Sequence, residues 1–268
     1  MTTRDEQRSP LRWIKWVIVG VVAAVALFFG AIFFYTEIID DSPDELSTAD
    51  LDERLSGTAP ATAPSATAGP TTAPAGTTAS TAGGTATTPP AATGDGIDGT
   101  WMVTDASELG YRVDEVLFGV DNAAVGRTNE VTGSLSANGT TVTEAEFVVD
   151  MTTITSDDAR RDGQYNGRIM STDEFPTSTF TLTAPIELGA IPAEGEQVTA
   201  TATGDLTLRG VTRPVTFEVT AQLEGGRIGV LGSIPIVFAD YEIPNPSFSG
   251  IETKDEGVIE FVLVFERA

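Results

Sequence analysis

Two residue types are missing from this chain of 268 residues: it has no cysteine and no histidine. Without cysteine there is no disulfide framework, no thiolate nucleophile and no lipobox cysteine for lipid attachment. Without histidine the chain lacks the usual general base and the commonest metal ligand. Serine and threonine are plentiful, but no histidine is present to activate them. We therefore predict a protein that is not an enzyme and that needs no metal or organic cofactor.

Positive charge is scarce as well. The chain has 15 Lys and Arg against 39 Asp and Glu, a formal net charge of −24. Such a charge repels nucleic acid and anionic membrane surfaces, and it favours a soluble body outside the cytoplasm. We therefore expect no nucleic-acid partner.

One long apolar run lies near the N-terminus. No residue from Val17 to Phe34 is charged, and with its flanking residues the run approaches the roughly 30 Å needed to cross a bilayer as a helix. Trp13 and Tyr35 mark its two ends, where aromatic rings favour the membrane interface. The run predicts a transmembrane helix over residues 13–35, preceded by a short tail over residues 1–12.

Flanking charges predict the orientation of this helix. Arg and Lys residues precede the run, and Asp and Glu residues follow it closely. The positive-inside rule then places residues 1–12 in the cytoplasm and everything after Tyr35 outside, as a single-pass protein of the cell membrane. A cleaved signal peptide is the competing interpretation, since Ala24-Val25-Ala26 resembles a cleavage site. The apolar run continues well beyond that site, which favours an uncleaved anchor.

Residues 36–99 read as a linker. Residues 37–55 are acidic and offer at most a weak, short helix. From Gly57 to Gly96 the sequence is almost entirely Ala, Thr, Pro, Gly and Ser, so it has too little apolar surface to offset the entropy of folding. This composition predicts a disordered tether that lifts a domain off the membrane. A more specific alternative is that the same Thr/Pro-rich residues form a stalk that carries O-linked sugars.

Residues 100–268 carry the only repeated strand signals. Apolar residues alternate with polar ones in about eight segments, with no long helices between them, which is typical of an antiparallel sandwich or closed barrel. The segments are Leu109–Val113 and Val116–Val120, interpreted as an early strand pair, then Ala145–Met151, Phe180–Leu182, Thr203–Val219, Ile234–Phe238 and Ile259–Phe265.

Two hairpins have turn signals. In Thr203–Val219 the alternation is interrupted at Gly210, which is free to adopt positive φ, and Pro214 is expected at the entry of the second strand. Asn138-Gly139 is a strong two-residue hairpin signal, although Asn138-Gly-Thr140 also matches a glycosylation sequon. Ser156–Pro176 breaks the strand pattern and predicts a short, partly helical crossover on the barrel rim, capped by Ser156 or Asp157.

Three motifs carry a resemblance to a known family. Thr203–Val219 is similar to the "G.LTLRGVT.PVTF.V" hairpin of the YceI-like family, whose members resemble lipocalins. The other two motifs, in the expected order, are Trp101-Val103-Asp105-Ser107 and the segment from Ile154-Thr155 through Arg161-Asp162 to Asp173–Phe180. The resemblance covers residues 100–268. It departs from the family pattern where the family has histidines, at Ala106 and Gln164.

This resemblance implies an all-β, extended eight-stranded antiparallel barrel around a hydrophobic cavity. The implied ligand is a long-chain lipid: an isoprenoid, a quinone-type molecule or an acyl chain, bound for carriage, storage or stress protection. An eight-stranded barrel is wide enough for one small ligand, so the geometry permits this function.

Candidate cavity residues follow from the apolar faces of the strands. They are Phe118, Phe147, Val149, Phe180, Leu182, Leu206, Leu208, Phe217, Phe238, Phe261 and Leu263. Arg161 and Asp162 are the candidates for contact with a lipid head group at the rim. A metal loop in this acidic and basic stretch is disfavoured, because its spacing does not match an EF-hand and no histidine is available.

The sequence leaves a second function and the oligomeric state open. The same apolar stripe is typical of a solid core, which would make the domain a structural or adhesion-type surface module. The sequence also leaves open whether the domain forms a homodimer.

Overall fold

The structure is a computed structural model. It describes five segments of the chain, which are residues 20–30, 43–57, 96–117, 119–248 and 250–268. Residues 20–30 are helical. Within these segments no helix is long and apolar enough to cross a bilayer. The rest of the predicted transmembrane helix, and the linker from 58 to 95, lie outside the described residues.

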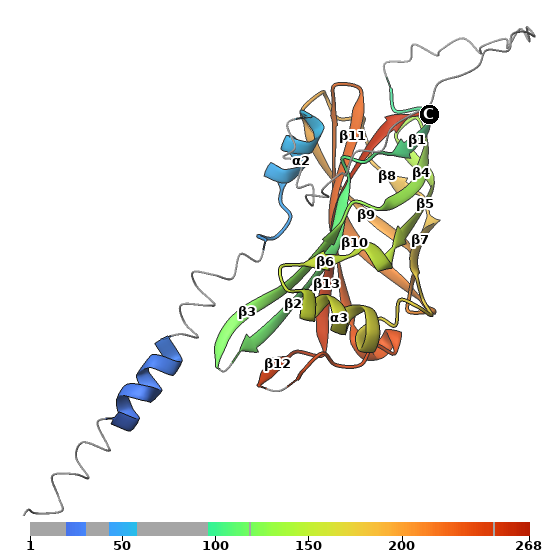
Figure 1. The fold of residues 1–268 in the computed structure, drawn as a ribbon. Helices are drawn as coiled ribbons and strands as arrows, with labels where there is room; N and C mark the ends of the chain where they lie inside the picture. The colour runs from blue at the N-terminus through green and yellow to red at the C-terminus, as the bar shows by residue number, and fades with distance from the viewer. Residues whose placement is uncertain (1–19, 31–42, 58–95, 118, 249) are drawn as a thin grey trace, which may run out of the picture.

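Eight antiparallel strands close into a barrel, as the sequence predicts (Figure 1). Each strand pairs with the next in the order β1-β4-β5-β7-β9-β10-β11-β13, and β13 pairs with β1 to complete the ring. The strands are β1 (Gly99–Val103), β4 (Val131–Asn138), β5 (Thr141–Asp150), β7 (Thr177–Ala184), β9 (Gln197–Leu208), β10 (Val211–Glu224), β11 (Arg227–Val237) and β13 (Glu256–Arg267).

A second group of strands branches from the long strand β13. The end of β13 pairs with β1, whereas its first half pairs with β2 (Glu108–Leu117). The buried hydroxyl of Ser107 lies at this fork and accepts a hydrogen bond from the backbone N of Val264 (2.9 Å). The sheet continues from β2 to β3 (Val120–Thr128) and β6 (Thr155–Ser156), while β12 (Ile251–Thr253) pairs with β2 and β8 (Ile186–Glu187) with β5.

The prediction of two early strands, Leu109–Val113 and Val116–Val120, placed the boundary between the strands wrongly. Leu109–Val113 and Val116 belong to one strand, β2, whose partner is β3. Neither strand belongs to the ring of eight, and two strands of that ring, β1 and β4, were not among the predicted segments. The sequence hides the continuity of β2 because Glu115 occupies an inward, buried position, where only 7% of it is exposed. A carboxylate at such a position interrupts the hydrophobic alternation although the strand itself continues.

Both predicted hairpins are confirmed. The β9–β10 turn places Arg209 (φ 48°) and Gly210 (φ 75°) in the left-handed region, and Asn138-Gly139 connects β4 to β5. Pro214 lies inside β10 rather than at its entry, opposite Asp205. Its position is tolerated because β10 pairs with β11 only from Val219 onward, so no ladder partner requires its missing N–H.

Short helical segments lie at the ends of the barrel strands. They are η2 (Met151–Thr153), α3 (Ala159–Gln164), the π-helical η3 (Tyr165–Ile169) and η4 (Phe238–Tyr241). The partly helical crossover is therefore confirmed. Its cap is Asp158, one residue beyond the predicted positions, because the Asp158 carboxylate accepts a hydrogen bond from the backbone N of Arg160 (2.8 Å).

The structure corrects the proposed linker at residues 43–57. These residues contain the helix α2 (Thr48–Leu55), which lies against the outside of β11 and β13 (Figure 1). Leu51 is fully buried and Leu55 is 4% exposed, and both contact the barrel at Gly229. An amphipathic helix of eight residues has little stability alone, so this tertiary contact decides its order.

Candidate functional site: the barrel cavity

A cavity of about 970 Å³ occupies the interior of the barrel. Inward-facing side chains of β4, β5, β7, β9, β10, β11 and β13 form its walls, together with residues of β2. Most of these side chains are apolar, because each strand turns its hydrophobic face inward. The volume and lining suit a cofactor- or lipid-sized ligand.

Ten of the eleven predicted cavity residues line this space. They are Phe147, Val149, Phe180, Leu182, Leu206, Leu208, Phe217, Phe238, Phe261 and Leu263. The eleventh, Phe118, lies outside the described residues. The sequence pattern thus placed the inward faces of β5, β7, β9, β10 and β13, although it could not show that the interior is open.

Glycines on the neighbouring strand lie beneath several of the lining rings. A Cβ atom at Gly232 would lie 2.5 Å from Cζ of Phe261, and one at Gly133 would lie 2.8 Å from Cδ1 of Phe147. Both distances are shorter than van der Waals contact. Each ring therefore occupies the space that a side chain at the glycine would need, and it lies against the wall.

Five phenylalanine rings form a continuous aromatic belt. Their centroids follow one another at 5.7, 6.3, 5.5 and 6.0 Å in the order Phe265, Phe147, Phe180, Phe217 and Phe261. Such contacts stabilise ring positions beyond simple burial. The belt fixes the rings along the wall and supports an open interior rather than a solid core.

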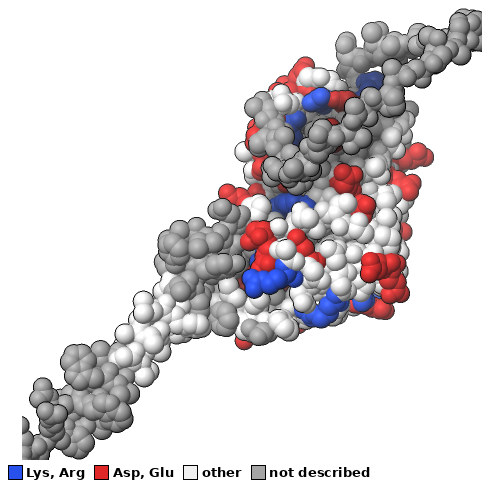
Figure 2. Space-filling model, viewed as in Figure 1, with Lys and Arg blue, Asp and Glu red and all other residues white. Residues whose placement is uncertain are grey.

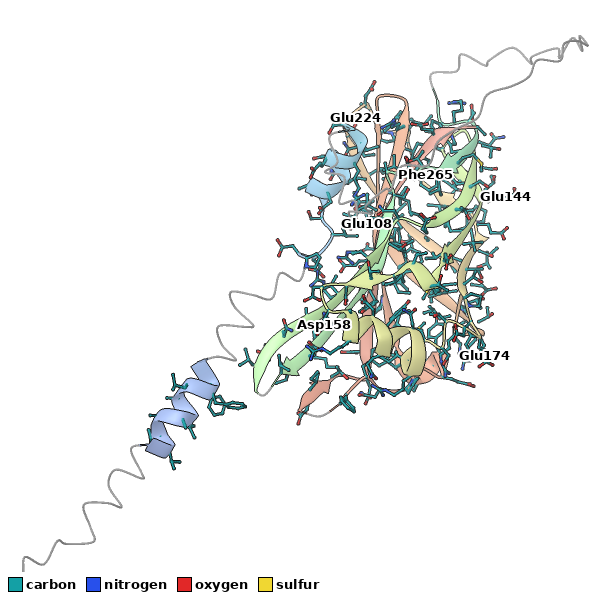
Figure 3. All side chains as sticks on the ribbon, viewed as in Figure 1. Glu108, Glu144, Asp158, Glu174, Glu224 and Phe265 are labelled. Carbon is teal, nitrogen blue, oxygen red and sulfur yellow. The ribbon has the colours of Figure 1, made fainter. Side chains whose placement is uncertain are left out.

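The cavity opens at the end that carries α3 and β12. Within the barrel domain, the exposed side chains among its lining residues are Arg160, Gln164, Arg168 and Phe248, all at this end. We call this end the mouth. In Figure 3, Asp158 and Glu174 lie toward it, and Glu224 lies at the opposite end.

The opposite end is closed by buried side chains. Ile97 is 4% exposed and Gln222 is 3% exposed, and both line the cavity. The Gln222 amide is satisfied by Gln197 and Glu224, each through a hydrogen bond of 3.0 Å. This end therefore offers no exposed lining residue in the part of the chain that the structure describes.

The two predicted rim residues differ in position. Arg161 lines the mouth and forms ion pairs with Asp157 and with Glu115, the latter at 3.5 Å. Asp162 is not among the lining residues. Its Oδ1 atom instead accepts hydrogen bonds from the backbone N (2.8 Å) and the hydroxyl (2.7 Å) of Ser156, which secures the crossover.

Sequence reasoning missed three lining residues near the mouth. The rings of Tyr111 and Tyr165 stack with centroids 5.1 Å apart, and the carboxylate of Glu115 accepts a hydrogen bond from Asn122 (3.0 Å). Burial raises the pKa of both tyrosines well above the ordinary value of 10.0. Tyr111 was visible in the alternation of β2, but no signal indicated its partner across the crossover.

Chemically, the arrangement is suited to binding. Across the described ranges, no group of three His, Cys, Asp or Glu side chains could hold a metal ion. The acidic and basic residues of the crossover form ion pairs and caps, and Figure 2 shows acidic side chains distributed over the visible outer face. The polar lining groups lie mainly at the mouth and the apolar ones along the barrel.

The family comparison agrees with this geometry. Residues 101–265 match the family described as YceI-like domain. The chain belongs to the YceI-like family. The match spans the barrel from β1 into β13, and it does not include α2.

The chain is also similar to individual proteins in sequence and in structure. A UPF0312 protein of Vibrio campbellii is 31% identical over 145 residues, covering 50% of this chain and 73% of the relative. A UPF0312 protein of Shewanella sp. is 31% identical over 128 residues, covering 44% and 63%. A polyisoprenoid binding domain from Saccharophagus degradans superposes with a TM-score of 0.52 at 23% identity, covering 63% of this chain and 98% of that structure. At this identity the superposition shows the fold alone.

Proposed function

We propose that this YceI-like domain binds one long-chain lipid of isoprenoid, quinone or acyl type and does not transform it. The observation that carries the proposal is the apolar cavity of about 970 Å³, closed at one end and open at the other. A linear lipid would pass its chain through the aromatic belt and place its head group at the mouth. Arg161 and Glu115 would then lie near that head group.

The comparisons support the same ligand class. The structural neighbour from Saccharophagus degradans is described as a polyisoprenoid binding domain, and it covers 63% of this chain. The cavity lining supports binding rather than catalysis, because no histidine or cysteine exists in the chain. The ligand would be held for carriage, storage or protection.

We further propose that the chain is held at a membrane by residues 13–35, with the barrel outside the cytoplasm. The support is the uncharged run from Val17 to Phe34 and the distribution of charges around it. Expression of the full chain in a bacterial host followed by alkaline extraction of membranes tests this. A protein released by alkali would contradict the anchor.

Lipid binding is tested with residues 43–268, which include the barrel and the docked helix α2. The protein is purified without detergent and analysed by native mass spectrometry before and after incubation with a quinone or a fatty acid. We expect one lipid per chain. A folded chain that neither retains nor takes up lipid would contradict the proposal.

A cavity-filling variant separates an open barrel from a solid one. Leu206 lines the cavity, whereas Thr207 faces outward on the same strand and its hydroxyl contacts that of Thr212. Leu206→Trp should reduce lipid uptake with little loss of stability, and Thr207→Trp should leave uptake unchanged. In a solid core, overpacking at Leu206 would cost about 1–3 kcal/mol. A large destabilisation in a chain that never binds lipid would favour the structural module.

A further inference from the structure

The docked segment 43–57 follows the barrel wall in one direction. Its first residues lie nearest the mouth: Arg112 donates a hydrogen bond to the backbone O of Pro43 (2.6 Å). Leu46 donates its backbone N–H to Glu260 (2.8 Å), and Gly57 ends the segment beside Arg227. Because β11 begins at Arg227 and runs toward the mouth, the segment proceeds from mid-barrel to the closed end.

Charged residues of the barrel bind the first residues of the docked segment. Glu260 is 2% exposed, and its Oε1 atom accepts hydrogen bonds from Arg112 (2.9 Å) and Arg127 (2.8 Å). Arg54 of α2 pairs with Glu108 (2.7 Å). The segment is thus attached to the barrel by charged groups near both of its ends and by the buried side chains of Leu51 and Leu55.

The long low-complexity stretch does not separate the barrel from the N-terminal run. Its 38 residues, from 58 to 95, begin after Gly57 and end before Gly96. Gly57 lies beside Arg227, and the backbone O of Gly96 accepts a hydrogen bond from Arg267 (2.8 Å). Arg227 forms an ion pair with Glu266, next to Arg267, so both ends of the stretch meet the closed end of the barrel.

Only a short stretch connects the barrel to the apolar run. Seven residues, 36–42, lie between Tyr35 and Pro43. Fully extended, they span at most about 25 Å. Pro43 lies level with Arg112, five residues before the end of β2 at Leu117, or roughly 17 Å from the tip of that strand. Pro43, where the described segment begins, therefore lies nearer the mouth than the rest of the segment does, and the length of residues 36–42 limits its distance from the apolar run.

The mouth also carries an exposed aromatic side chain. Phe248 lines the cavity and is 62% exposed, the largest value among the large hydrophobic side chains of the barrel that the structure describes. It lies in a bridge with Ile251 at the start of β12. An exposed phenylalanine beside the opening is suited to burial at the boundary between lipid head groups and acyl chains.

From this geometry we infer that the docked segment orients the barrel with its mouth toward the membrane that holds the N-terminal run. The partner surface is a lipid bilayer, and the ligand enters from it directly. Gly57 and Gly96, which flank the 38-residue stretch, then lie at the membrane-distal end of the barrel. This inference rests on the membrane anchoring proposed above, but not on the identity of the lipid.

The test measures the distance of each barrel end from a bilayer. Because the chain has no cysteine, one introduced cysteine gives one label. Ala159→Cys labels the mouth and Ala193→Cys labels the closed end, both at exposed alanines. The full chain is reconstituted into phosphatidylcholine vesicles that contain an acceptor dye on their head groups, and energy transfer is measured from each site. β9 is about 40 Å long, and with the usual tilt of barrel strands this separates the two ends by roughly 30 Å, so transfer from Ala159→Cys should be several-fold stronger.

Two further changes separate the docked segment from a stalk. Deleting residues 62–91 should leave both transfer efficiencies unchanged, because residues 58–95 connect Gly57 to Gly96 and both glycines lie at the closed end of the barrel. Inserting a flexible Gly/Ser segment after Thr36 should weaken transfer and make the two sites alike. Equal transfer from both sites in the unmodified chain, or closer approach after the deletion, would overturn the inference.

The outcome is distinguishable from that of the lipid-binding proposal. A barrel that takes up no lipid but shows strong transfer from Ala159→Cys refutes lipid binding and supports the orientation. A lipid-binding barrel with equal transfer refutes only the orientation. A full chain that does not float with vesicles overturns both the anchoring and the orientation.

Discussion

The contact between α2 and Gly229 offers a selective way to release the docked segment. A Cβ atom at Gly229 would lie 2.5 Å from Cδ1 of Leu51 and 2.8 Å from Cδ1 of Leu55, on the outside of the barrel. Either leucine could accommodate an alanine by rotating its side chain, but Leu51 is fully buried and has no room for more. Gly229→Val adds two further methyl groups and also favours the strand. It should therefore displace α2 and leave the barrel intact.

The expected magnitude follows from overpacking. Inserting methyl groups into a well-packed contact costs about 1–3 kcal/mol. If docking and undocking are faster than cleavage, the rate of proteolysis follows the undocked population, so it should rise by about 5- to 150-fold.

Trypsin provides the assay. Arg54 is the only basic residue between Lys15 and Arg112, and its side chain is 16% exposed because it contacts Ala106 and Glu108. Cleavage after Arg54 therefore reports the release of α2. Ser233→Val is the matched control, since Ser233 is exposed on the same strand and the same outer face. An unchanged cleavage rate in Gly229→Val, with wild-type thermal stability, would refute the role of this contact.

Two further predictions concern buried ionisable groups. Burial in the folded state raises the pKa of Tyr111 and Tyr165, so their contribution to stability is complete below pH 10 and is lost as the pH rises above it. Denaturation measured between pH 8 and pH 12 should show the free energy of unfolding falling by up to about 2.7 kcal/mol per pH unit above pH 10. Tyr165→Phe should about halve that slope. A slope unchanged by Tyr165→Phe would contradict this reasoning. Glu260→Gln should lower the free energy of unfolding, measured by urea denaturation, by about 3–5 kcal/mol, because Arg112 and Arg127 lose a buried, charged partner. Lys254→Gln breaks an exposed ion pair with Asp114 and should cause no measurable loss; equal effects of the two substitutions would show that burial does not matter here.

Much of the barrel could be predicted from the sequence because strands have a period of two. The alternation in β5, β9, β10 and β13 identified their inward faces, and two glycine-containing turns located the hairpins. The prediction was wrong where one residue broke the period. Glu115 concealed the continuity of β2, since a buried carboxylate looks like an outward residue in the sequence.

Other features depended on contacts between distant residues. Residues 43–57 read as linker because their short helix has only Leu46, Leu51 and Leu55 to bury, and the surface that covers them belongs to β11 and β13. The partner of Tyr111 could not be identified, because Tyr165 lies on a crossover with no periodic pattern. Asp162 was assigned to the rim, but its carboxylate bonds to Ser156 within the crossover.

By itself the sequence determined the family, the inward faces of β5, β7, β9, β10 and β13, and the absence of histidine and cysteine chemistry. These properties are local, or they depend on residue types and short spacings. The tertiary structure decided that the barrel has an open interior, because rings such as Phe261 lie over glycines on neighbouring strands. It also decided which end opens and how residues 43–57 attach, since both depend on strand pairing and long-range packing that no local pattern contains.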